Sequence, residues 1–150
     1  PKEKMEKIYL ALVSDDFSVT GLKHFFDILL AQKEGAVLWH CSAGKDRVGT
    51  TAALLLTALG VDREVIIQDY LLTNGYLEPE TEAMIAKVAA KVPNERILNG
   101  IRILNGAERS YIESMFAETE RQCGSTEVYL QERLGLTDEK REMLREMYLV

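Results

Sequence analysis

The sequence is poor in the residues that build metal centres and disulfide frameworks. Its 150 residues include two cysteines, two histidines, three prolines and one tryptophan. Cys41 and Cys123 lie far apart and belong to no Cys-x-x-Cys or Cys/His cluster, which argues against a structural zinc site. We therefore expect neither a metal site nor a cofactor.

Long apolar runs and basic tracts are missing as well. No apolar run approaches the roughly 20 residues that a membrane span needs, so stable membrane insertion is not expected. The net charge is −6, and no basic or basic-aromatic tract is present, which argues against nucleic acid as a partner. The chain length and the 47% of hydrophobic residues suit one domain with a modest core.

One stretch carries a clear chemical pattern, His40-Cys41-Ser42-Ala43-Gly44-Lys45-Asp46-Arg47-Val48-Gly49. The apolar residues 36–39 before it predict a strand, and the run 50–56 after it predicts a helix. A cysteine thus stands at the end of the predicted strand, and an arginine follows six positions later at the mouth of the helix.

This arrangement suits attack on phosphorus. Consecutive backbone N–H groups that curl ahead of a helix N-terminus form a nest for an anion of phosphate size. The same positive field lowers the pKa of a cysteine thiol from about 8.5 to roughly 3.5–7.5, which would make Cys41 a thiolate at neutral pH. Arg47 can bind two phosphate oxygens with its planar guanidinium. Gly44 and Gly49 allow the tight turn and the close start of the helix.

The pattern His40-Cys41-x-x-Gly44-x-x-Arg47-x-Gly49 resembles the signature loop of the cysteine-dependent protein tyrosine phosphatases. With Lys45 and Asp46 it resembles the bacterial branch of dual or triple specificity. The runs 59–66 and 69–74 also look like that branch. The resemblance implies a phosphomonoester hydrolase whose substrate is a phosphotyrosine protein, with phosphoserine/threonine or phosphoinositide as further possibilities.

The resemblance also implies roles for individual residues. Cys41 would form a phosphocysteine while Arg47 holds the phosphate oxygens. Asp46 is our preferred proton donor; Asp15, Asp16 or an acid further upstream are the alternatives. The remaining residues predicted to bind substrate or shape the loop are Ser42, Ala43, Gly44, Lys45, Val48 and His40. Lys45 either recognises a second phosphate or is a solvated loop lysine.

Val48 departs from the family pattern. Ser or Thr is common directly after the arginine, where its hydroxyl helps the sulfur to leave in the second step. Thr50 or Thr51 could supply a hydroxyl instead. We therefore expect slow hydrolysis of the phosphoenzyme.

The implied fold is α/β, a parallel sheet with helices on both faces. Only residues 36–40 predict a convincing strand, and residues 7–13 suit a strand or a helix. Helices are expected over 19–30, 50–59 and 64–74, in a further helix that opens at 78–79, and from 110 onward. In the family the region near 78–93 forms a lid or an inserted helical pair, and plain packing is the alternative. Residues 1–150 are expected to be a single phosphatase domain, the C-terminal portion of a longer domain whose other strands lie upstream.

Other functions fit less well. A non-catalytic phosphopeptide-binding module, a sulfur- or arsenate-handling cysteine loop and a helical interaction domain are the alternatives. A disulfide between Cys41 and Cys123 would remove the nucleophile, so we expect a reducing compartment, the cytoplasm, with export as an effector left open. The sequence does not predict an oligomeric state.

Overall fold

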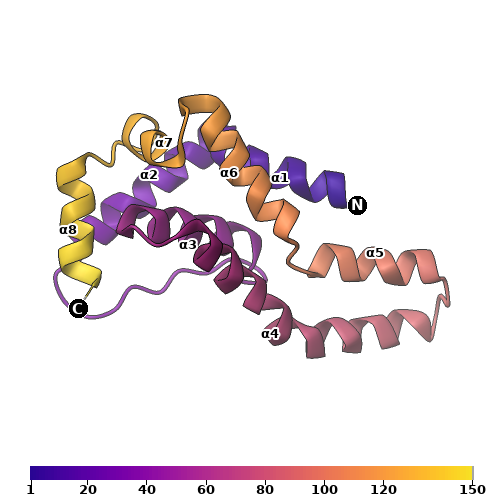
Figure 1. The fold of residues 1–150 in the computed structure, drawn as a ribbon. Helices are drawn as coiled ribbons and strands as arrows, with labels where there is room; N and C mark the ends of the chain where they lie inside the picture. The colour runs from indigo at the N-terminus through magenta and orange to yellow at the C-terminus, as the bar shows by residue number, and fades with distance from the viewer. Residues whose placement is uncertain (150) are drawn as a thin grey trace.

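The computed structural model describes residues 1–149, and within them the chain forms eight helices (Figure 1). Their bounds are α1 Lys2–Ser14, α2 Asp16–Ala31, α3 Asp46–Leu59, α4 Arg63–Ala89, α5 Glu95–Asn105, α6 Arg109–Cys123, α7 Thr126–Glu132 and α8 Asp138–Tyr148. The longest connection, residues 32–45, joins α2 to α3 and contains residues 40–45 of the signature stretch.

The prediction of an α/β fold with a parallel sheet is wrong for the part of the chain that the structure describes, where no residue is in a strand. Residues 36–40 belong to the connection between α2 and α3 and pair with no other segment of residues 1–149. An isolated strand cannot satisfy its backbone groups. Residues 7–13 belong to α1. Leu38 is 89% exposed, while the Trp39 ring packs against Phe25 with the ring centroids 5.2 Å apart.

Side-chain caps fix most of the helix starts. Asp15, Asp62, Asn94, Ser125 and Thr137 each accept a hydrogen bond from a backbone N–H of the first turn of the helix that follows. Such caps satisfy donors that have no partner inside the helix.

The predicted break within α4 is absent. Residues 63–89 form one helix that contains both Gly75 and Pro79, where two helices were expected. Proline removes one helical hydrogen bond, but strong helix formers on both sides keep the segment helical.

The core gathers around α1, α3 and α6. Helix α1 packs along α6, and α3 packs against α4, α7 and α8. The largest fully buried side chains include Tyr9, Tyr111, Tyr129, Phe26 and Leu54. In Figure 1 the second half of α4 and α5 extend away from this core as a pair, which we call the α4–α5 hairpin. No helix within residues 1–149 combines the length and apolarity required to cross a membrane.

Gly49 of α3 lies against Tyr70 of α4. A Cβ atom added there would lie 3.0 Å from the ring of Tyr70, which is 5% exposed and hydrogen-bonded to Tyr9 at 2.6 Å. A Cβ atom added at Gly75, inside α4, would meet nothing within 4 Å. The two glycines therefore differ in their surroundings although both lie in helices.

We predict that Gly49→Ala lowers the free energy of unfolding by about 1–3 kcal/mol, because the held Tyr70 ring cannot move aside. The matched variant Gly75→Ala should raise it by about 0.5–1 kcal/mol through helix propensity alone. Denaturant unfolding of both variants checks this, and equal shifts of the same sign would contradict it.

Candidate active site

The signature loop turns sharply between the extended segment and α3. Gly44 has φ +66°, a left-handed conformation that favours glycine. Helix α3 begins at Asp46, earlier than the sequence predicted, and its first intrahelical bond runs from the Gly49 N–H to the Lys45 carbonyl at 2.7 Å. The N–H groups of the first turn are therefore free to bind an anion.

The sulfur of Cys41 lies in that position. The backbone N–H groups of Val48, in the first turn of α3, and of Ala43, Gly44 and Lys45, in the loop, lie around the sulfur and lower the pKa of the Cys41 thiol. Partial burial raises the pKa of the Cys41 thiol, but these four donors outweigh it and hold the pKa below its ordinary value. The local backbone thus stabilises the nucleophilic thiolate form.

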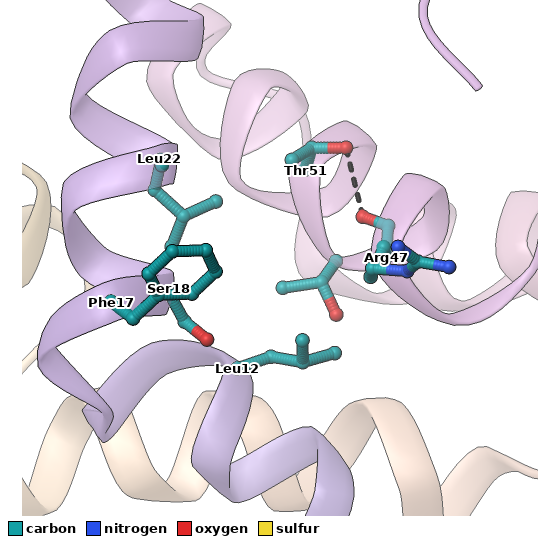
Figure 2. A pocket seen from close by; sticks show the side chains of 8 residues that line it. Leu12, Phe17, Ser18, Leu22, Arg47 and Thr51 are labelled. Atoms are coloured by element: carbon teal, nitrogen blue, oxygen red, sulfur yellow. Dashed lines mark hydrogen bonds between the residues drawn. The ribbon is translucent and has the colours of Figure 1, made fainter. Parts of the chain in front are cut away.

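Arg47 stands on the exposed side of the loop. Its Nη2 donates to Ser42 Oγ at 3.2 Å. Figure 2 shows Arg47 and Thr51 of α3 across a pocket from Phe17 and Leu22 of α2. The pocket has a volume of about 210 Å³, and its other lining residues are Leu12, Ser18, Gly21 and Thr50.

Asp46 is held from outside the loop. Its Oδ1 accepts a hydrogen bond from the Tyr9 hydroxyl at 2.8 Å and lies 3.3 Å from Lys45 Nζ. The Asp46 side chain is 31% exposed. It therefore combines a fixed oxygen with access to solvent, which is the geometry a proton donor needs.

Lys45 is buried and does not lie at the solvent-exposed rim of the loop. Its side chain is 2% exposed, and its Nζ donates to the Leu104 carbonyl at 2.7 Å and the Gly106 carbonyl at 3.0 Å. The last carbonyls of α5 lack helical partners, so the buried ammonium is well satisfied there. The prediction of a solvated loop lysine is wrong, and recognition of a second phosphate by Lys45 stays a prediction.

The remaining candidates are dispersed. His40 is exposed, with Nδ1 3.4 Å from the Cys41 carbonyl. Asp15 caps α2 by accepting the Ser18 N–H at 3.1 Å, as an ordinary helix-entry residue does. The Thr51 hydroxyl donates within α3, to the Arg47 and Val48 carbonyls. The Thr50 hydroxyl is buried with no partner among the described residues.

A second pocket adjoins the loop on the side of the α4–α5 hairpin. It has a volume of about 290 Å³ and is lined by Ala43, Lys45, Asp46, Leu77, Glu80, Thr81, Met84, Leu104 and Asn105. The hairpin thus borders the site. Within residues 1–149, no three His, Cys, Asp or Glu side chains lie close enough together to hold a metal ion.

The sequence did not point to the groups that hold Asp46 and Lys45. Tyr9 lies on the apolar stripe of α1 and Tyr70 in the middle of α4, so both look like ordinary core residues. The acceptors of Lys45 are backbone carbonyls, which carry no sequence signal. Only the three-dimensional structure shows that the Tyr9 hydroxyl is hydrogen-bonded both to Asp46 of the loop and to Tyr70.

The contrast between the two cysteines yields a prediction. The pKa of Cys41 is lowered by backbone N–H groups, whereas burial raises the pKa of Cys123. A lowered pKa preserves the thiolate at lower pH, so the rate–pH profile for iodoacetamide labelling of Cys41 should have its midpoint below the value of about 8.5 for a free thiol. Peptide mass spectrometry distinguishes the two sites, and Cys123→Ser isolates Cys41. Identical midpoints for both thiols would contradict the account.

Comparison with known proteins agrees with this geometry. The model of the tyrosine phosphatase family matches residues 1–150. A tyrosine-protein phosphatase of Nostoc commune is 48% identical over 56 residues, 37% of this chain. The triple specificity protein phosphatase PtpB of Mycobacterium tuberculosis is 50% identical over 52 residues, 35% of this chain. A relative from Cupriavidus necator, also named for tyrosine-protein phosphatase activity, is 28% identical over 127 residues, 84% of this chain.

The matches cover only part of each relative. They span 19%, 18% and 45% of the lengths of the Nostoc, Mycobacterium and Cupriavidus proteins. The family model, in contrast, covers every residue of the chain, including the signature loop and the helices that hold it. The chain belongs to the tyrosine phosphatase family.

Proposed function

We propose that this chain carries the catalytic centre of a phosphomonoester hydrolase that acts through a phosphocysteine on Cys41. The observation that carries the proposal is the lowered pKa of the Cys41 thiol, caused by four backbone N–H groups around its sulfur, three in the loop and one in the first turn of α3. Such a nest stabilises a thiolate and can also bind the oxygens of a phosphoryl group. Arg47 and Asp46 stand within the same turn and supply the other two functions that the reaction needs.

In the first step the Cys41 thiolate attacks phosphorus in line with the leaving oxygen. The S–P bond forms as the P–O bond to the alcohol breaks, and Asp46 gives its proton to the departing oxygen. The loop amides and the Arg47 guanidinium neutralise the charge on the equatorial oxygens.

In the second step water attacks the phosphocysteine. The Asp46 carboxylate accepts a proton from the water, the S–P bond breaks, and inorganic phosphate leaves. The thiolate is a better leaving group when donors stabilise it, and the four backbone N–H groups do so. The centre then returns to its starting protonation state.

We infer phosphoproteins as the substrate class, with phosphotyrosine first. The names of the Nostoc and Mycobacterium relatives, a tyrosine-protein phosphatase and a triple specificity phosphatase, support this. Phosphoinositides remain a second candidate substrate class, but the Lys45 ammonium is bonded to α5 carbonyls and lends them no support in this conformation. The thiolate chemistry requires a reducing compartment, which we infer to be the cytoplasm.

Substitution of the two reacting groups tests the proposal. Cys41→Ser should abolish hydrolysis of p-nitrophenyl phosphate and of phosphotyrosine peptide. Asp46→Asn should lower turnover of phenyl phosphate by about 10²–10⁴-fold, and that of p-nitrophenyl phosphate much less, because only the poor leaving group needs a proton.

A matched control is Asp138→Asn, since Asp138 opens α8 as Asp46 opens α3. It should leave both rates unchanged. Activity that survives Cys41→Ser would end the phosphatase proposal. Tight phosphate binding without turnover by the unaltered protein would instead favour a binding module.

Val48 generates a second test. A hydroxyl at this position would donate to the departing sulfur, and a hydrogen bond to a charged group contributes about 1.5–3 kcal/mol. We expect Val48→Thr to raise steady-state turnover about tenfold and to leave the initial burst of product unchanged. Val48→Ala removes both methyl groups without adding a hydroxyl and should not accelerate turnover. A gain that is equal in both variants would refute this reading.

A further inference from the structure

We propose that Tyr9 of α1 and Tyr70 of α4 form a positioning pair that holds the Asp46 carboxyl for proton transfer. The proposal rests on the function proposed above, in which Asp46 is the proton donor. It assigns a role in the reaction to two core residues that lie outside the signature stretch in the sequence.

Both tyrosines are buried, and a hydrogen bond joins their hydroxyl groups. Tyr9 is 0% exposed and Tyr70 5% exposed, and their hydroxyl oxygens lie 2.6 Å apart. The Tyr9 hydroxyl donates its single proton to Asp46 Oδ1 at 2.8 Å, so Tyr70 must donate to Tyr9. The rings meet edge to face with centroids 6.0 Å apart, which fixes the direction of both hydroxyls.

The two carboxyl oxygens of Asp46 have different surroundings. Oδ1 receives the Tyr9 hydroxyl and faces Lys45 Nζ at 3.3 Å. Oδ2 makes no hydrogen bond to any residue among 1–149, and the side chain is 31% exposed. The arrangement thus anchors one oxygen in the protein and leaves the other for the substrate.

The other buried tyrosines show that this is not what packing alone produces. The hydroxyl of Tyr111 donates to the Ile103 carbonyl at 3.1 Å, and that of Tyr129 to the Val13 carbonyl at 2.9 Å. Both satisfy a buried hydroxyl on backbone, as is usual. Tyr9 and Tyr70 end on a carboxylate of the signature loop instead.

The pair also stays protonated at working pH. Burial is the main cause that raises the pKa of Tyr9 and of Tyr70 well above that of a free tyrosine. Neither hydroxyl therefore ionises as the reaction proceeds, and Tyr9 remains a donor whether or not Asp46 carries a proton to deliver. A fixed donor of this kind restrains orientation, and small losses of orientation can slow a reaction considerably.

The experiment removes single hydroxyl groups from the full protein. Tyr9→Phe should lower kcat for phenyl phosphate about tenfold, with little change for p-nitrophenyl phosphate, because the effect passes through the proton donor. In an Asp46→Asn background the same substitution should cause no further loss. Tyr129→Phe, which also removes a buried hydroxyl bonded to α1, should affect both substrates equally or not at all.

The outcomes separate the two claims. If Asp46→Asn shows the expected leaving-group dependence but Tyr9→Phe slows both substrates equally, or still slows the Asp46→Asn variant, the positioning role is overturned and the proposed function stands. If Asp46→Asn shows no such dependence, the proton-donor role fails and the positioning role fails with it. If thermal unfolding shows that Tyr9→Phe does not fold, Tyr70→Phe decides the question. It should lower kcat for phenyl phosphate less than Tyr9→Phe would, again with little change for p-nitrophenyl phosphate.

Discussion

The convergence of backbone N–H groups on the Cys41 sulfur is the constraint on which the site depends. Four backbone amides, one of them in the first turn of α3, lie around this sulfur and lower the pKa of the thiol. Such a concentration of donors favours an anion at its centre, whether a thiolate or a phosphate oxygen. The loop conformation and the reactive form of the cysteine therefore stabilise each other.

The helical core holds this nest from three sides. Helix α3 is fixed by Ala53, Leu54 and Ala58, which are fully buried. Helix α1 reaches Asp46 through Tyr9, and the end of α5 reaches Lys45 through its carbonyls. A buried ammonium without partners would be costly, so Lys45 ties the base of the α4–α5 hairpin to the signature loop. The base of that hairpin is thereby bonded to the residue beside Asp46.

Sequence patterns located the reacting groups because their chemistry is local. Cys41 and Gly44 stand at fixed spacing before α3, and Arg47 lies in its first turn. The contacts that decide the states of Lys45 and Asp46 are not local. They come from residues more than 35 positions away, Tyr9, Leu104 and Gly106, and no pattern near the loop announces them.

The failures of prediction have equally physical causes. Residues 36–40 have the composition of a buried strand, but a strand exists only by pairing, and the described chain offers it none. Gly75 and Pro79 are helix breakers by propensity, yet α4 continues through both because propensity is a weak preference that context overrides. The starts of α4 and α6 lie within one residue of the predicted 64 and 110, whereas α2 and α3 begin three and four residues before the predicted 19 and 50.

The most direct test of the account is to stop turnover of p-nitrophenyl phosphate with acid and to search the digested protein for a covalently bound phosphoryl group. The account predicts phosphate on the peptide that contains Cys41, which forms within the first turnover and disappears when substrate is exhausted. Phosphate on another residue, or sustained turnover with no phosphorylated Cys41 at any time, would contradict it.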